Sequence, residues 1–140
     1  MHFTTLFILK NETLETTPQW KIEEMFQDRF CYCCGETKPT IYAWCDCFKI
    51  GGRWCDLLKA NKGLYGERSW TNKGETPNNG MYSIVEIKDL TEDLPIENIY
   101  AIATKSHIYL KNANQEYINL VNKINNKQIN GVIALIDCHD

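Results

Sequence analysis

The pattern of apolar and polar residues along the chain predicts six β-strands. Short runs rich in Ile, Val, Thr, Tyr and Phe, bounded by Gly, Pro or Asn, are typical of strands. Such runs lie at residues 2–9, 40–49, 81–88, 99–104, 107–111 and 132–138. The last run, VIALIDC, is almost continuously apolar, which is typical of a strand buried on both faces.

Apolar residues at helical spacing predict two α-helices. The first covers residues 18–30, with Thr17 as its N-cap and Pro18 at its first helical position. The second follows a capping-box pattern at residues 112–115 and ends before Gly131. The two apolar stripes consist of Ile22, Met25, Phe26 and Phe30, and of Tyr117, Leu120, Val121 and Ile124.

The order of these elements predicts an α+β fold with a mainly antiparallel sheet of about six strands. We expect both helices on one face of the sheet, in a ferredoxin-like arrangement. A chain of 140 residues is long enough for one domain, so residues 1–140 are expected to form a single domain. A short helical turn is expected at 54–60, and a long polar loop at about 61–80.

Composition narrows the classes of protein to which this chain can belong. It is 44% hydrophobic and 24% charged, with a net charge of −3, which excludes bulk disorder and does not favour nucleic-acid binding. No run approaches the roughly 20 apolar residues of a membrane span. The N-terminus lacks the basic region of a signal peptide, so we expect a protein of the cytoplasm with no membrane partner.

Charge is unevenly distributed along the chain. Acidic residues dominate 12–28, whereas basic residues dominate 49–73, where Trp54, Tyr65 and Trp70 also lie. A basic segment with aromatic residues suits an anionic ligand or an acidic partner. The alternative is a solvated loop whose lysines keep the protein soluble.

The seven cysteines are expected to be reduced, because disulfides are rare in the cytoplasm. One hypothesis is a zinc site made by Cys31, Cys34, Cys45 and Cys47, in which Cys31 and Cys34 form a CxxC pair. If 40–49 is a strand, Cys45 and Cys47 share a face about 6.5 to 7 Å apart, which is wide for one zinc ion unless Cys55 replaces one of them. The alternative is that these residues are buried free thiols, with no cofactor at all.

A nucleophilic cysteine would need a histidine within hydrogen-bond reach. The candidates are His2, His107 and His139. Cys138 and His139 are adjacent, but on a strand they point to opposite faces and cannot pair with each other. The spacing therefore does not indicate an enzyme.

The segment IGGRW at residues 50–54 is the strongest local signal for a binding site. Gly51 and Gly52 allow positive φ or close approach of the backbone, and they leave N–H groups to point at a ligand. Arg53 could bind a phosphate through two hydrogen bonds, and Trp54 could stack on a base. Alternatively, Arg53 pairs with a buried carboxylate, either Asp46 or Asp137, and Trp54 fills the core.

The run CDCFKIGGRW at 45–54 resembles the W-D-W-Y-x-I-G-G-R-W signature of small uncharacterised bacteriophage and prophage proteins. The segment 101–110 and the ending IDCH at 136–139, which is similar to a terminal V-D-C-H, agree with this resemblance. Seven positions carry over: Asp46, Gly51, Gly52, Arg53, Trp54, Asp137 and His139. Cys45 and Cys47 stand where the family pattern has tryptophan, which indicates packing or pocket-wall positions and counts against zinc.

The resemblance implies a phage or prophage accessory protein of the counter-defence type. We expect a non-enzymatic binder of an anionic small molecule, such as a nucleotide messenger, with these seven residues around one pocket and the loop 55–75 as its lid. One alternative is a protein–protein inhibitor of a host or antiviral defence enzyme, of the anti-CRISPR kind, acting through the acidic helix or the basic loop. A zinc-stabilised binding module is a further alternative. The least favoured alternative is a nucleotide hydrolase that uses His139 and Asp137. The protein could also form a homo-oligomer.

Overall fold

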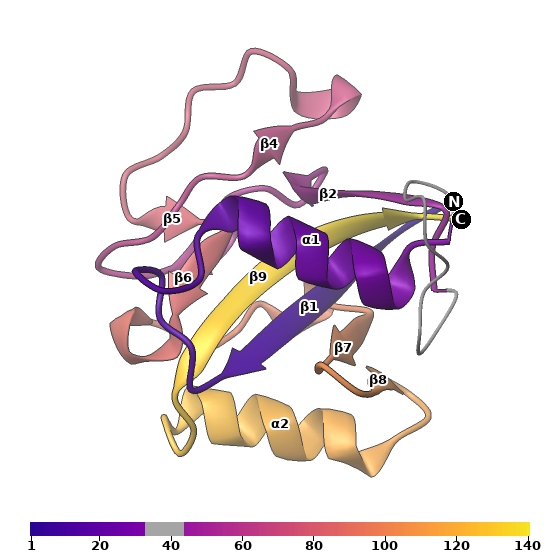
Figure 1. Ribbon diagram of the computed structural model, residues 1–140. Helices are drawn as coiled ribbons and strands as arrows, with labels where there is room; N and C mark the ends of the chain where they lie inside the picture. Colours follow the sequence, from indigo (N-terminus) through magenta and orange to yellow (C-terminus); the bar gives the residue numbers. More distant parts are fainter. Residues whose placement is uncertain (33–43) are drawn as a thin grey trace.

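A mixed β-sheet of seven strands forms the centre of the protein (Figure 1). The computed structural model describes residues 1–32 and 44–140. The sheet order is β4 (Glu67–Arg68), β2 (Cys47–Gly52), β9 (Gly131–His139), β1 (His2–Lys10), β7 (Ala101–Ala103) and β8 (Ile108–Leu110). The seventh strand, β6 (Ile84–Glu86), pairs with β9 on the same edge as β2.

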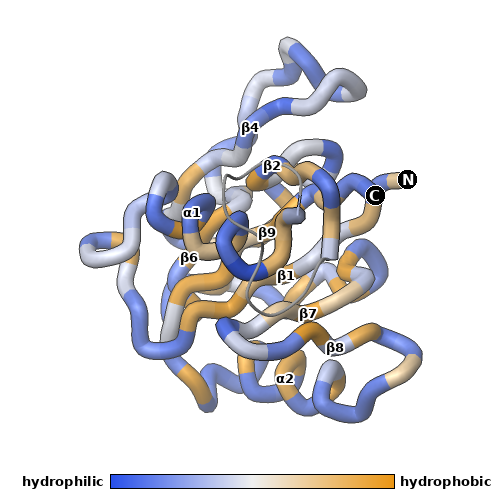
Figure 2. Tube along the Cα trace, turned by 45° about the vertical axis from the view of Figure 1, so that its right-hand side comes forward, coloured by the Kyte–Doolittle hydropathy of each residue, from blue (hydrophilic) through white to orange (hydrophobic). Residues whose placement is uncertain are grey.

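The central pair of strands confirms the first and last strands predicted from the sequence. β1 and β9 run antiparallel over nine residue pairs, from His2 opposite His139 to Lys10 opposite Gly131. Eight of the nine residues of β9 are buried, as expected for an apolar run with cover on both faces. Figure 2 shows the apolar residues gathered along these strands, while the chain beyond β4 is polar.

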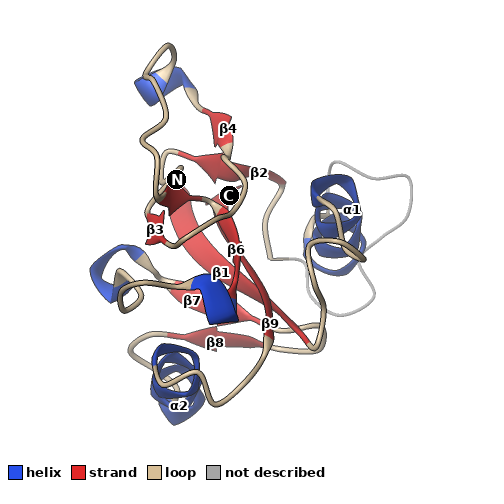
Figure 3. Ribbon diagram, turned by 90° about the vertical axis from the view of Figure 1, so that its left-hand side faces the viewer, coloured by secondary structure: helices blue, strands red, loops and turns tan. Residues whose placement is uncertain are grey.

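The two helices, α1 (Gln19–Phe30) and α2 (Gln115–Asn125), lie on opposite faces of the sheet (Figures 1 and 3). Along β1, Phe7 and Leu9 pack in the cluster of α1, whereas Leu6 and Ile8 pack in the cluster of α2. The expectation of both helices on one face is therefore wrong. The physical reason is that β1 and β9 are apolar on both faces, so each face needs a helix to exclude water.

The α+β class and the two helices are confirmed, and the sheet is only partly as expected. Four of its strand pairs, including the β7–β8 hairpin, are antiparallel, but β1–β7 and β2–β4 are parallel; β3 and β5 form a separate antiparallel pair. With helices on both faces, the arrangement differs from the ferredoxin-like layer that was expected. Within residues 1–32 and 44–140, neither helix has the length and apolar composition needed to cross a bilayer.

The middle of the chain departs most from the predicted elements. Residues 40–43 of the predicted strand 40–49 lie outside the described residues, and β2 starts only at Cys47. The helical turn expected at 54–60 is wrong: Asp56 has φ of 62°, and β3 (Leu58–Lys59) follows it. The predicted strand 81–88 is divided into β5 (Met81–Tyr82), which pairs with β3, then β6 and a 3₁₀ turn at Ile87–Asp89.

Both predicted helix caps are shifted. Thr17 does not cap α1: it is buried, and its hydroxyl donates to Glu12 Oε2 at 2.8 Å, while Pro18 takes the N-cap position. The cap of α2 is Asn114, whose side chain accepts from the Glu116 amide. The loop predicted at 61–80 contains β4 and a 3₁₀ turn, η1, at Trp70–Asn72.

Candidate functional site

The sheet face covered by α2 changes from apolar to polar at one end. Residues two apart on a strand share a face, so the α2 face of β1 and β9 continues beyond Leu6 and Leu135 to the chain termini. Strand register there places six residues in two rows across β1, β9 and β2: Thr4, Asp137 and Lys49, then His2, His139 and Cys47. The N- and C-termini lie side by side at this end (Figure 1).

A cavity of about 310 Å³ lies over these rows. Its floor consists of residues of β1, β2 and β9, including His2, Asp137 and His139. The opposite wall is the segment 69–71, which carries Trp70, and Arg53 lies at the end of β2. The cavity therefore combines a buried carboxylate, two imidazoles, a guanidinium and an indole.

Asp137 is the buried centre of the site, with 4% of its surface exposed. Its Oδ1 lies 2.8 Å from His2 Nδ1, and its Oδ2 accepts the Arg53 amide at 2.9 Å. The contact between imidazole and carboxylate ties His2 of β1 to Asp137 of β9. Asp137 thus positions His2 and the backbone of Arg53, two residues that line the cavity.

Gly52 allows the Asp137 carboxylate to approach the backbone at the end of β2. Its φ is +56°, and a Cβ built on it would lie 2.3 Å from Asp137 Oδ2. A side chain at this position would push the carboxylate away from the Arg53 amide. The close backbone approach expected from the two glycines is therefore directed at a protein carboxylate.

A second pair of imidazole and carboxylate stands beside the first. His139 Nδ1 lies 2.9 Å from Asp46 Oδ1, and this hydrogen bond holds the pKa of Asp46 below its ordinary value. The rings of His2 and His139 meet edge to face with centroids 4.9 Å apart. Within the described residues, Nε2 of each ring forms no hydrogen bond to protein, so both Nε2 atoms remain available.

Arg53 and Trp70 give the cavity its binding groups. The Arg53 side chain is exposed and forms no ion pair with any residue in 1–32 or 44–140. Trp70 is 88% exposed, which is unusual for an indole, and Lys73 Nζ lies 5.8 Å from its ring centroid. Lys49, on the cavity floor, has only a loose contact of 3.5 Å with Glu67, and both side chains are about half exposed.

A buried polar network holds the 66–72 segment in place. The guanidinium of Arg68 lies 2.7 Å from Asp56 Oδ2, and Asp56 Oδ1 accepts hydrogen bonds from the Gly66 amide and the Ser83 hydroxyl. Asn72 Nδ2 donates to the carbonyl of Gly52 at 2.9 Å. These bonds tie the wall that carries Trp70 to the strand that ends in Arg53.

The structure brings together part of the residue set that the sequence indicated. Arg53, Asp137 and His139 line the cavity, Asp46 adjoins it through His139, and Gly52 lies against Asp137. The remaining two lie elsewhere: Gly51 packs on Gly66, and Trp54 is half-buried and does not line the cavity.

Six lining residues belong neither to the seven motif positions nor to the cysteine set: His2, Phe48, Lys49, Ser69, Trp70 and Thr71. His2 was considered only as a partner of a nucleophilic cysteine, although the apolar patterns of 2–9 and 132–138 already predicted two long strands. The basic and aromatic character of 49–73 was the available signal for Lys49 and Trp70.

The described cysteines occupy different environments, and Cys55 lies beside Asn72, whose amide donates to its sulfur. Cys31, Cys45 and Cys138 are buried in the core below α1, where the neighbouring Cys138 and burial hold the pKa of Cys45 well above its ordinary value. Cys47 is exposed at the cavity, and Cys34 lies outside the described residues. Burial and the adjacent Asp46 raise the pKa of Cys47, so this thiol is not an activated nucleophile.

The four-cysteine metal set stays a prediction, because Cys34 lies outside the described residues. Cys45 precedes β2 and pairs with Cys31 in an isolated bridge, and β2 begins at Cys47. Among the described residues, one group has three metal-ligating atoms within 4.8 Å of one another: Asp46, Cys47 and His139.

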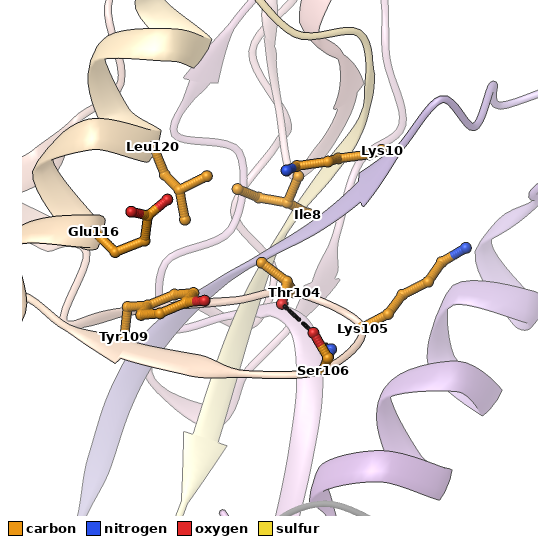
Figure 4. A pocket seen from close by; sticks show the side chains of 8 residues that line it. All are labelled: Ile8, Lys10, Thr104, Lys105, Ser106, Tyr109, Glu116 and Leu120. Carbon is orange, nitrogen blue, oxygen red and sulfur yellow. Dashed lines mark hydrogen bonds between the residues drawn. The ribbon is translucent and has the colours of Figure 1, made fainter.

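A second cavity, of about 340 Å³, lies between the β7–β8 turn and α2 (Figure 4). The side chain of Lys105 points away from it in Figure 4, and its Nζ bonds to Glu12 at 3.2 Å. Among the described residues that line it, Glu116 is the only acidic one, and none is a histidine or cysteine. Its chemistry is less specific than that of the cavity at the chain termini.

Comparison of the chain with models of known protein families, with curated proteins and with solved structures gives no match.

Proposed function

We propose that this protein is a non-enzymatic binder of an anionic, planar small molecule, such as a nucleotide messenger, in the cavity at its chain termini. The observation that carries the proposal is the presence in one cavity of a guanidinium, Arg53, that forms no ion pair within the described residues, and of a highly exposed indole, Trp70. Neither group is needed to fill the core. Together they offer a charge for a phosphate and a flat surface for a base.

The chemistry of these groups matches the two parts of a nucleotide. A guanidinium binds phosphate oxygens through paired, charge-assisted hydrogen bonds. The indole of Trp can stack on any of the bases. The Nε2 atoms of His2 and His139 add two further polar contacts on the floor. The volume of about 310 Å³ lies at the lower end of the range of small-molecule sites, which begins at about 300 Å³.

Binding is favoured over catalysis because the best candidate nucleophile is not activated. The pKa of Cys47 is raised by burial and by Asp46, whereas a catalytic cysteine needs a lowered pKa. In the phage context that the motif at 45–54 implies, sequestering a nucleotide messenger would serve counter-defence. The ligand class rests on the cavity, and the biological setting rests on the motif.

The test is calorimetric titration of the protein with a panel of mono- and dinucleotides. We expect Arg53→Ala and Trp70→Ala each to weaken binding by about 5-fold or more, because a charged hydrogen bond and a base–aromatic stack each contribute about 1 to 3 kcal/mol. Lys62→Ala and Trp20→Ala are matched controls, since both side chains are exposed and lie outside the cavity. No binding by the wild type, or equal loss in the controls, would refute the proposal.

A second candidate is a protein–protein inhibitor, and one observation favours it. Trp20 is 64% exposed on α1, whose outer surface also carries acidic residues such as Glu24 and Asp28. Aromatic residues are enriched at protein interfaces. Capture of a stoichiometric host protein by the wild type, lost on Trp20→Ala and kept on Trp70→Ala, would favour this candidate over the nucleotide binder.

A further inference from the structure

At the edge of the cavity, three side chains of different chemistry converge. Asp46 precedes β2, Cys47 is its first residue, and His139 is the last residue of β9, directly opposite Cys47 in the strand register. The carboxylate oxygen, thiol sulfur and imidazole nitrogen all lie within 4.8 Å of one another. The backbone fixes this grouping, because the Asp46 amide also donates to the His139 carbonyl at 2.9 Å.

We propose that Asp46, Cys47 and His139 form a binding site for a divalent transition-metal ion, zinc being the best fit. A thiolate, an imidazole and a carboxylate are the ligands that zinc uses in proteins, and hard ions such as magnesium and calcium avoid sulfur. The set differs from the four cysteines that the sequence indicated and shares only Cys47 with them. The inference goes beyond the nucleotide-binding proposal and does not rest on it.

The three ligand atoms lie within 4.8 Å of one another, so small side-chain movements bring them to the spacing of a tetrahedral ion. Ligand distances of about 2.0 to 2.3 Å place neighbouring ligand atoms of a zinc tetrahedron about 3.3 to 3.8 Å apart. His139 Nδ1 and Asp46 Oδ1 are already 2.9 Å apart, joined by a proton that the metal ion would replace. The side chain of Cys47 is exposed, so its sulfur can move by the ångström that completes the set without disturbing the core.

The proton balance of binding follows from these groups. The carboxylate of Asp46 is already ionised, the imidazole moves its proton from Nδ1 to Nε2, and the thiol of Cys47 releases its proton to solvent as the sulfur–metal bond forms. Three protein ligands leave the fourth position of the tetrahedron open. Cys47 and His139 also line the cavity, so the proposed ion site adjoins it.

Residues next to the three proposed ligands hold one of them in place. His2 is held by Asp137 through its Nδ1, and its ring packs against that of His139. This contact restricts rotation of the His139 ring. His2 is not a member of the group of three and is assigned a positioning role.

The experiment is titration of the full-length, chelator-treated protein with Co²⁺ and then Zn²⁺, followed by absorption spectroscopy. We expect a thiolate-to-cobalt charge-transfer band at one ion per chain, displaced by Zn²⁺. Cys47→Ser should abolish the band, and His139→Gln should weaken metal binding at least about 10-fold. Cys55→Ser and Cys34→Ser should keep the band, because neither residue belongs to the proposed set.

A band that survives in Cys47→Ser, or that is lost in Cys34→Ser, would overturn the proposal in favour of another cysteine set. Circular dichroism of each variant controls for folding, and Zn²⁺ should raise the melting temperature of the wild type but not of Cys47→Ser. The test separates the two proposals. Nucleotide titration of the chelated protein reports on the cavity alone, and metal titration without nucleotide reports on these three ligands alone.

Discussion

The contact between Gly52 and Asp137 shows how one residue shapes the cavity. Asp137 reaches the Arg53 amide only because Gly52 has no side chain and accepts a φ of +56°. The same carboxylate orients His2. A single missing methyl group therefore sets the position of residues on two strands.

Gly52→Ala is expected to lower the free energy of unfolding by about 2 to 5 kcal/mol, from a positive φ and from a Cβ that would meet Asp137 at 2.3 Å. Gly74→Ala is the matched control, because Gly74 also has positive φ but has no atom within 4 Å of its added Cβ. It should lose only about 1 kcal/mol, from backbone strain. Urea unfolding measures both, and equal losses would contradict the close contact.

Glu12 links two loops and gives a pH-dependent contribution to stability. Hydrogen bonds from Thr17 and then from Lys105 hold its pKa below the ordinary value of 4.5. A lowered pKa stabilises the folded state above pH 4.5, and this stabilisation is lost as the pH falls through the folded value. Since Glu12 is partly exposed to solvent, the contribution is about 0.5 to 1 kcal/mol.

Glu12→Gln should therefore destabilise the protein at neutral pH and approach wild-type stability below the folded pKa. The measurement is the midpoint of urea unfolding for both proteins between pH 3 and pH 7. A difference that stays constant over this range would show that the charge of Glu12 plays no part.

At the residue scale, the sequence predicted some site residues better than others. Arg53, Asp137 and His139 were identified through the motif, and the structure places all three at one cavity. Trp54 was expected there, but the turn after Gly52 directs it elsewhere, and Trp70 lines the cavity from the loop. The path of that loop depends on long-range bonds such as Arg68 to Asp56, which spacing along the chain does not reveal.

At the element scale, periodicity predicted the helices and the long strands, but it did not predict which face of the sheet each helix covers. The stripe of a helix shows which of its faces is buried and says nothing about which face of the sheet it covers. The available signal was β1 itself: all six residues from Thr4 to Leu9 are buried, so both of its faces require cover. Short strands such as β3 and β4, of two residues each, are too brief to produce a pattern.

The start of α2 gives an element-scale prediction. Asn114 caps the helix through the Glu116 amide, so Asn114→Ala should lower stability by about 1 kcal/mol. Asn112, the cap expected from the sequence, is exposed and precedes the helix, so Asn112→Ala should have little effect. Thermal unfolding of the two variants decides between the positions, and a larger loss for Asn112→Ala would contradict the observed cap.

At the scale of the whole molecule, two apolar clusters share the central strands. Phe26 of α1 and Leu120 of α2 lie in different clusters, and β1 and β9 contribute residues to both. Loss of either cluster therefore removes support from the same strand pair. The fold should behave as one cooperative unit despite its two cores.

Phe26→Ala and Leu120→Ala are expected to destabilise the protein by about 3 to 5 and 2 to 5 kcal/mol respectively, while each keeps a single unfolding transition. Calorimetry, together with near- and far-ultraviolet circular dichroism, measures this. A biphasic transition in either variant would show that the α1 and α2 sides unfold independently and would contradict the shared-strand account.

The candidate site is itself a property of the whole molecule. His2 and His139 lie at opposite ends of the chain and meet because β1 and β9 pair in one register over their full length. A shift of that register by one residue would turn Asp137 and His139 to the α1 face. The fold class was predictable from local patterns, whereas this meeting of the termini needed the register that only the assembled sheet defines.

Whether the polar end of the sheet binds an anionic planar ligand is tested by an NMR titration of ¹⁵N-labelled protein with the nucleotide panel. We expect amide shifts to concentrate at Arg53, at residues 69–71 and at the ends of β1, β2 and β9, with the Arg53 amide that bonds Asp137 among the most affected. Unchanged spectra with every nucleotide, or shifts confined to the second cavity around Lys10, Thr104 and Ser106, would contradict it.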